Sequence, residues 1–380
     1  MTNANWSYPT SIRLGVGRVS EIAEACAAAK ISKPLLVTDR GLAKMPITQT
    51  ALDFIKKAGL GRALFAEVDP NPNELNMQEG VEVFRQGKHD GVIAFGGGSG
   101  LDLGKMIAFM AGQKRPVWDF EDIGDWWTRA DANAIAPIIA VPTTAGTGSE
   151  VGRAGVITNS KTHVKKIIFH PKLLPAVAIL DPELTVGMPA HITVGTGMDA
   201  FVHCLEAFSS PFFHPMSQGI ALEGMRLVKE NLPKVFADGS DLEARGNMMV
   251  AASMGAVAFQ KGLGAAHAIS HQIGAIYNTH HGMTNAVVLP AVLEMNRLAI
   301  KDRVGDAANY LGISGGFDGF LRFVLKMRSD LGVPDKLRSL GVGKDRIEEL
   351  ADMSLQDPSA GGNPVKMTKD NTIALLRACI

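Results

Sequence analysis

Apolar residues follow two different patterns of spacing along the chain. In the first half, short runs rich in Val, Ile and Leu alternate with segments of helical periodicity, the pattern typical of a parallel sheet with crossover helices. The strand-like runs are residues 34–39, 62–68, 91–95, 135–141 and 176–180. The helical segments between them are residues 20–30, 47–58, 74–88 and 100–111. A β-hairpin is predicted over residues 155–169, with its turn at 159–161.

After about Thr185 the strand-like runs disappear and long helical patterns follow. They cover residues 191–208, 216–231, 242–261, 265–277, 284–299, 319–331 and 368–379. This change in the hydrophobic pattern predicts two domains, an α/β nucleotide-type domain in residues 1–185 and an all-helical domain in residues 186–380.

Charge and cysteine content narrow the classes of protein. Among 380 residues, Lys and Arg number 38 and Asp and Glu number 38, so no basic excess favours nucleic-acid binding. The longest apolar run, residues 134–142, is far shorter than the roughly 20 residues of a membrane helix, and no signal peptide is visible. The three cysteines, Cys26, Cys204 and Cys379, lie too far apart in sequence to resemble a disulfide framework. We therefore expect a cytoplasmic protein without nucleic-acid or membrane partners.

A glycine loop follows the strand at 91–95 and opens a helix. Gly96, Gly97, Gly98 and Ser99 leave backbone N–H groups at a helix N-terminus, where phosphate binds readily. The loop matches neither the G-x-G-x-x-G fingerprint nor the P-loop, so it is either a phosphate site or a tight turn. A second run of hydroxyls and glycines, residues 143–149, follows another buried strand and is either a ligand-binding loop or an ordinary one. Asp39, at the end of a strand, is placed either to contact a ribose or to cap the next helix.

The second half carries the candidate metal chemistry. Asp199 and His203 are four residues apart in a helical pattern, and His267 and His271 repeat that spacing, so each pair shares a helix face. An aspartate with two or three imidazoles suits a first-row divalent metal, although each histidine taken alone is more often an ordinary helix residue. The second pair lacks the glutamate of H-E-x-x-H, which disfavours a zinc peptidase.

Four motifs in this order resemble the iron-containing (group III) alcohol dehydrogenases over nearly the whole chain. They are residues 96–99 with Asp102, residues 142–150, residues 197–206, and residues 262–267 through 278–282. The resemblance implies a Rossmann-like dinucleotide-binding domain and an all-α metal-binding domain, the architecture of dehydroquinate synthase.

The resemblance also implies roles for individual residues. One divalent metal is expected on Asp199, His203, His267 and His281. The resemblance implies Fe²⁺, whereas nitrogen and oxygen ligands generally bind Zn²⁺ more tightly. His271 is implied as the catalytic histidine near the substrate. The cofactor-binding residues implied are Asp39, Asn71, Gly97, Gly98, Ser99, Asp102, Thr143, Thr144 and Lys165. Asp39 favours NAD over NADP, because a carboxylate there repels a 2′-phosphate. Ala258 stands where some relatives carry an aromatic pocket residue.

The reaction expected is hydride transfer between NAD(H) and a small alcohol, diol or (semi)aldehyde. A polyol dehydrogenase of the glycerol type, a dehydroquinate-synthase-like lyase and a non-catalytic nucleotide-binding protein are the alternatives. Arg153 and Lys261 are either contacts for an acidic aldehyde or solvated surface residues. The family suggests a homodimer or a larger homo-oligomer.

Overall fold

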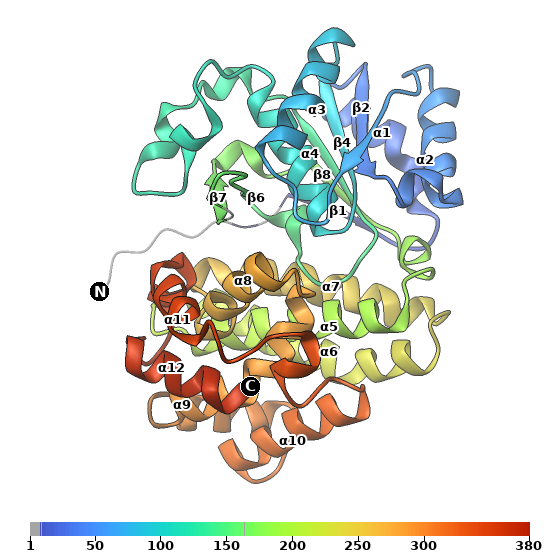
Figure 1. The fold of residues 1–380 in the computed structure, drawn as a ribbon. Helices are drawn as coiled ribbons and strands as arrows, with labels where there is room; N and C mark the ends of the chain where they lie inside the picture. Colours follow the sequence, from blue (N-terminus) through green and yellow to red (C-terminus); the bar gives the residue numbers. More distant parts are fainter. Residues whose placement is uncertain (1–7, 9, 163) are drawn as a thin grey trace. The chain divides into compact units, whose positions relative to one another are not determined.

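The computed structural model describes Tyr8, residues 10–162 and residues 164–380. These residues form two compact units, Tyr8–Gly187 and Met188–Ile380. The first is an α/β unit and the second is helical, which confirms the fold class predicted from the sequence (Figure 1). Residues 1–7 and 9 of the predicted first domain and residue 163 of the predicted hairpin lie outside the described residues. No helix in the described part of the chain is long and apolar enough to cross a membrane.

A parallel sheet organises the first unit. Its strand order is β1-β8-β5-β4-β2-β3, and all neighbours run parallel. The strands are β1 (Ser11–Leu14), β2 (Pro34–Asp39), β3 (Leu64–Val68), β4 (Gly91–Gly96), β5 (Ile138–Pro142) and β8 (Val177–Leu180). The helices are α1 (Ile22–Ala28), α2 (Pro46–Lys57), α3 (Glu74–Gln86) and α4 (Gly98–Met110). The predicted hairpin is present as β6 (Ala154–Thr158) and β7 (Lys165–Phe169).

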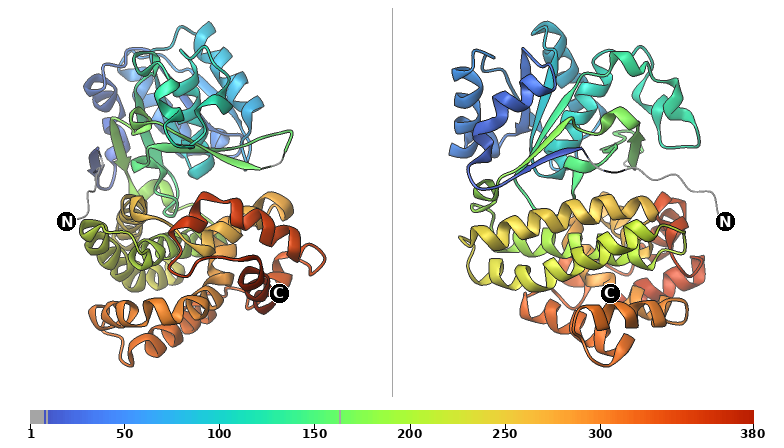
Figure 2. Two further views of the ribbon diagram at one scale, coloured as in Figure 1. Left: turned by 90° about the vertical axis from the view of Figure 1, so that its left-hand side faces the viewer. Right: turned by 180° about the vertical axis from the view of Figure 1, so that it is seen from behind.

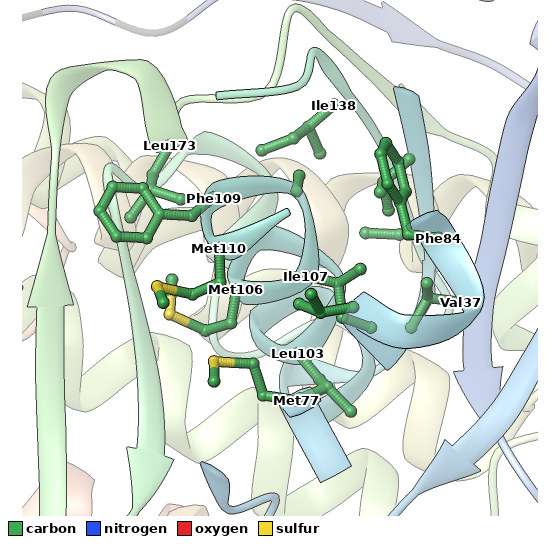
Figure 3. Close-up of a cluster of buried hydrophobic side chains, with 14 of the residues drawn as sticks. Val37, Met77, Phe84, Leu103, Met106, Ile107, Phe109, Met110, Ile138 and Leu173 are labelled. Atoms are coloured by element: carbon green, nitrogen blue, oxygen red, sulfur yellow. The ribbon is translucent and has the colours of Figure 1, made fainter. Parts of the chain in front are cut away.

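Strands β2, β4, β5 and β8 are buried on both faces of the sheet, and successive side chains of each strand point to opposite sides. On β4, Val92 and Ala94 belong to one core. That core also contains Met77 of α3 and Ile107 of α4 (Figure 3). Ile93 and Phe95 pack in the other core, with residues of α1 and α2. This explains why the strands are continuous apolar runs without polar alternation.

The order of the strands creates a switch point between β2 and β4. From β2 the chain moves outward to β3, and from β4 it moves the other way to β5 and β8. Ligands of open α/β sheets bind outside the carboxyl ends of the strands at such a point. Asp39 ends β2 and Gly96 ends β4, so both flank it.

The second unit is a stack of helices, in which α5, α6 and α7 run side by side (Figure 2). Its helices are α5 (Ala190–Ser209), α6 (Pro215–Ala237), α7 (Leu242–Ala258), α8 (Ala265–Tyr277), α9 (His281–Tyr310), α10 (Gly316–Asp330), α11 (Ile347–Gln356) and α12 (Lys369–Cys379). Every residue of α5 from Gly197 to Ser209 is buried. Polar side chains on that stretch therefore need partners inside the unit.

The sequence did not predict β1 and α11, and it predicted α9 too short. β1 is a four-residue strand with mostly exposed side chains, so it lacks an apolar pattern and depends on pairing with β8. α9 continues past Ala299 through a charged stretch, because Val304 and Ala307 still face the core. The pattern of α11 was present, since Ile347, Leu350 and Ala351 are buried at helical spacing.

Candidate metal centre and cofactor-binding loops

Four side chains from three helices of the second unit meet around Asp199. Asp199 and His203 lie one turn apart on α5, His267 lies on α8, and His281 is the first residue of α9. Asp199 Oδ1 is 3.7 Å from Nε2 of His267 and 3.4 Å from Nε2 of His281. Asp199 Oδ2 is 4.0 Å from Nδ1 of His203. The fold thus brings the four candidate metal ligands together.

Candidate ligand atoms of three of these residues surround one point, the side-chain nitrogen of Asn285. Nδ2 of Asn285, one turn after His281, lies 2.8 Å from Oδ1 of Asp199, 3.3 Å from Nε2 of His267 and 3.1 Å from Nε2 of His281. Ligand atoms of Asp199, His203 and His267 also lie within 4.8 Å of one another, and all three residues are buried. One carboxylate and two imidazoles from three helices thus surround one point, and this set of oxygen and nitrogen ligands fits a divalent cation.

The electrostatics of the metal-free centre agree with this chemistry. Burial raises the pKa of Asp199, but the facing imidazoles of His203, His281 and His267 hold it well below its usual value. Burial lowers the pKa of His267, but hydrogen bonds with Asp199 and Glu206 outweigh that effect and raise it to about 9. Without a cation, the proton on His267 balances the carboxylate, and a divalent cation competes with that proton.

The outer nitrogens of two of these histidines are held by residues that the sequence analysis missed. Nδ1 of His267 lies 2.6 Å from Oε2 of Glu206, and Nδ1 of His281 lies 3.1 Å from Oγ of Ser270. Such contacts fix ring orientation and tautomer. The position of Glu206 could have been predicted, because a residue seven positions after Asp199 lies on the same face of a helix. Ser270 had no comparable signal.

His271 lies at the edge of the centre. Its ring stacks on that of His281, with centroids 5.1 Å apart, and its Nδ1 lies 2.9 Å from Oδ2 of Asp357. Burial raises the pKa of Asp357, but the contact with His271 and backbone hydrogen bonding lower it overall, so the carboxylate stays ionised. Asp357 follows α11 far along the chain, and no local pattern in the sequence pointed to it. The contact with Asp357 thus uses Nδ1 of His271 and not Nε2.

Ala258, the position where some relatives carry an aromatic residue, ends α7 and is fully buried. The next residue, Phe259, places its ring centroid 5.2 Å from that of His203. An aromatic ring therefore contacts one candidate metal ligand from the position after Ala258.

In the first unit, the glycine loop and the threonine loop lie against each other. The N–H of Thr143 donates to the carbonyl of Gly96, at 2.9 Å. A Cβ atom on Gly97 would lie 3.2 Å from Cγ2 of Thr144, and one on Gly98 would lie only 2.7 Å from Cγ2 of Thr147. These close contacts favour glycine at both positions, and Gly97, Gly98 and Ser99 at the start of α4 are only partly buried.

The side chain of Asp102 links the loops through hydrogen bonds. Its carboxylate accepts hydrogen bonds from Oγ of Ser149 at 2.5 Å and from the N–H of Val156 at 3.1 Å. It also lies 3.2 Å from Nζ of Lys105, which is buried and donates to the carbonyls of Ser149 and Ala154. Asp102 therefore connects α4, the threonine loop and the hairpin.

The remaining candidate cofactor residues lie on different segments of the first unit. Oδ1 of Asp39 accepts from the N–H groups of Gly41 and Leu42, at 2.8 and 2.9 Å, so this carboxylate caps the turn after β2. Oγ of Ser99 donates to the carbonyl of Pro70, the residue before Asn71, at 2.6 Å. Lys165 starts β7 and pairs with Thr158 in the hairpin.

Lys261 is buried, which corrects its interpretation as a solvated surface residue. It is 2% exposed, and its Nζ donates to the carbonyl of Phe208 at 3.0 Å. Arg303 donates to the same carbonyl and to those of Ser209 and Ser210. The two cations cap the C-terminus of α5, where the helix dipole favours positive charge. Arg153 packs its guanidinium over the ring of Phe169, 5.3 Å from its centroid.

Replacing Lys261 by methionine should change how stability depends on pH. Burial and the neighbouring Arg303 lower the pKa of Lys261 from 10.5 to about 7. Between those values the unfolded chain binds the proton and the folded chain does not, so the stability of the wild type rises with pH. From about pH 7.5 to about pH 9.5 we expect the wild type to gain about 2 kcal/mol over Lys261→Met in urea unfolding. A constant difference between the two proteins would contradict the shifted pKa.

Comparison with known proteins identifies the family of both units. The family model described as iron-containing alcohol dehydrogenase matches residues 9–182, and its C-terminal counterpart matches residues 193–380. A 4-hydroxybutyrate dehydrogenase from Cupriavidus necator is 40% identical over 94% of this chain and 94% of that protein. An NAD-dependent methanol dehydrogenase from Bacillus methanolicus is 34% identical over 98% of this chain and 99% of that protein. A crystal structure of a 1,3-propanediol oxidoreductase, 36% identical, superimposes with a TM-score of 0.94 and covers 99% of both chains. The chain belongs to the iron-containing alcohol dehydrogenase family, as its motifs predicted.

Proposed function

We propose that this protein transfers hydride between NAD(H) and a small alcohol, diol or (semi)aldehyde at a single divalent metal. The observation that carries the proposal is the convergence of Asp199, His267 and His281 on one point in the core of the second unit. The names of the relatives, which include an NAD-dependent methanol dehydrogenase and a 4-hydroxybutyrate dehydrogenase, support the reaction and the cofactor.

The residues of the centre have distinct roles in this proposal. Asp199, His203, His267 and His281 hold the cation. When bound, the cation supplies Lewis acidity and the nicotinamide accepts or donates hydride. His271, held at Nδ1 by Asp357, takes or releases the substrate proton at Nε2. In the first unit, the dinucleotide is bound by Asp39, Asn71, Gly97, Gly98, Ser99, Asp102, Thr143, Thr144 and Lys165, and Asp102 also holds the loops in place.

The proposal is tested by turnover with a panel of substrates. Metal-free protein is reconstituted with Fe²⁺ or Zn²⁺ and supplied with short diols, simple alcohols, hydroxyaldehydes and ω-semialdehydes. Oxidation or formation of NADH that depends on the added metal supports a dehydrogenase. A lyase would turn over substrate without net change in NADH, and a non-catalytic nucleotide-binding protein would bind NADH without turnover.

Iron is the metal proposed, because the family carries iron in its name. Nitrogen and oxygen donors generally bind Zn²⁺ more tightly than Fe²⁺, so the supply of metal decides which one is found. We propose the reducing cytoplasm as the compartment and a homodimer or larger homo-oligomer as the assembly. The three cysteines are free and buried, which agrees with a reducing compartment.

Replacing Asp39 by asparagine should relax the preference for NAD. An amide at this position keeps an oxygen that accepts from Gly41 and Leu42, but it no longer repels a 2′-phosphate. We expect the ratio of kcat/KM for NADPH over NADH to rise at least about tenfold, which corresponds to about 1.4 kcal/mol.

Asp39→Ala serves as the control for that substitution. It removes the charge and also the capping oxygen, so it should additionally destabilise the first unit by about 1 kcal/mol. An unchanged coenzyme ratio in Asp39→Asn would remove Asp39 from the ribose site.

A further inference from the structure

The carboxylate of Glu206 joins the metal centre to the start of α8. Glu206 lies on α5, is 6% exposed, and accepts from the N–H of Ala266 at 2.7 Å and from the N–H of Gly264 at 3.0 Å. The first N–H groups of a helix have no partner within it, and a carboxylate is the favoured cap there. The same carboxylate contacts Nδ1 of His267 at 2.6 Å.

This third contact determines which nitrogen of His267 carries a proton. An ionised carboxylate only accepts hydrogen bonds, so Nδ1 must donate and must keep its hydrogen. In the neutral ring, which is the form that binds a metal, Nε2 then has the free lone pair, and it is Nε2 that faces Asp199 and Asn285, at 3.7 and 3.3 Å. A metal ligand needs that lone pair directed at the cation.

We propose that Glu206 is a positioning residue of the metal centre, which holds His267 as the Nδ1–H tautomer and presents Nε2 to the cation. The proposal rests on the metal site of the proposed function. It adds a residue outside the ligand set, and it makes the affinity for the metal depend on a carboxylate that also caps α8.

Glu206→Gln tests the contact with His267. Oε2 of the carboxylate accepts from the N–H of Gly264 and faces Nδ1 of His267, and Oε1 accepts from the N–H of Ala266. The single, uncharged amide oxygen of glutamine cannot serve all three N–H groups, so it no longer fixes the hydrogen on Nδ1 of His267 as the carboxylate does. We expect the Kd for Zn²⁺, measured by competition with a chelator, to rise about 10–100-fold. The visible absorption spectrum of the Co²⁺-loaded protein should change as well, because the geometry around His267 changes.

Asn363→Ala is the matched control. Its Oδ1 accepts from the N–H of Ala265, so it caps the same turn of α8 without contacting His267. If Glu206 acted only by stabilising α8, Asn363→Ala would weaken Zn²⁺ binding to a similar degree, and that result would overturn the proposal. We expect Asn363→Ala to lose thermal stability and to keep the wild-type Kd and Co²⁺ spectrum.

A measurement on the wild type keeps the proposal testable if Glu206→Gln does not fold. Nitrogen-15 NMR of the Zn²⁺-loaded protein, with the signals of His267 assigned by their loss in His267→Asn, should show a protonated Nδ1 and a metal-bound Nε2. A metal-bound Nδ1, or wild-type Zn²⁺ affinity in folded Glu206→Gln, overturns the role of Glu206 alone. A wild type that binds neither Zn²⁺ nor Co²⁺ overturns the metal site itself and this role with it.

Discussion

Asp199→Ala is expected to lose its bound metal and to lower turnover by at least about a thousandfold. Asp199 supplies the carboxylate of the candidate ligand set, and it faces His203, His267 and His281 within 4.0 Å. A Lewis-acid metal contributes several kcal/mol to the transition state, and each 1.4 kcal/mol or so is a factor of ten in rate. Metal analysis of the purified protein and NADH-linked turnover are the measurements.

Two further variants show that the effect belongs to the site. Asp199→Asn keeps the volume of the side chain and removes its charge, so it should also lose metal while it preserves the packing of α5. His191→Ala replaces an exposed histidine on the same helix and should leave metal content and turnover unchanged. An Asp199→Ala protein with full metal content and activity would show that the cation, if any, binds elsewhere.

Local periodicity predicted those parts of the centre that lie within one helix. The spacing of Asp199 and His203 placed both on one face of α5, and the structure has them there. The limits predicted for α8, residues 265–277, match those found. His267 and His271 share that helix, yet their outer nitrogens contact different carboxylates, Glu206 and Asp357. Spacing on a helix thus indicates which residues are neighbours and not which partner each one takes.

The contacts that complete the centre come from segments distant in sequence. Asn285 and His281 approach Asp199 only because α9 packs against α5. No motif length or hydrophobic period specifies that crossing. The family resemblance named His281, because a motif records the outcome of packing. It included Glu206 in a motif without giving it a role, and it did not name Asn285 or Asp357.

The same distinction holds for the first unit. Five of the six strands of its parallel sheet were predicted within about three residues, because buried parallel strands are continuous apolar runs, and only the exposed β1 was missed. Asp102 was grouped with the cofactor residues, and the structure shows its carboxylate bonded to Ser149 and Val156. A motif can therefore include a residue that holds a loop together as well as residues that face the ligand.

Gly98→Val is expected to lose NAD(H) binding while it keeps the metal. A Cβ atom at Gly98 would lie 2.7 Å from Cγ2 and 3.1 Å from Oγ1 of Thr147, so a larger side chain must push the threonine loop away from α4. Overpacking of this kind costs about 1–3 kcal/mol, and the same side chain blocks the approach of a phosphate to the backbone. We expect the Kd for NADH, measured by fluorescence titration, to rise at least about tenfold. Gly219→Ala, at an open position on α6, is the control.

A double variant identifies the cause of that loss. Gly98→Ala adds only the Cβ atom, and Thr147→Ser removes the Cγ2 atom that it would meet. If the clash between the loops weakens binding, the double variant should bind NADH more tightly than Gly98→Ala alone. If the added methyl acts on the phosphate, Thr147→Ser should not restore NADH binding.

The metal content of all these variants should equal that of the wild type, because the candidate ligands all lie in Met188–Ile380. A loss of metal in Gly98→Val would contradict this separation of the cofactor loops from the metal centre.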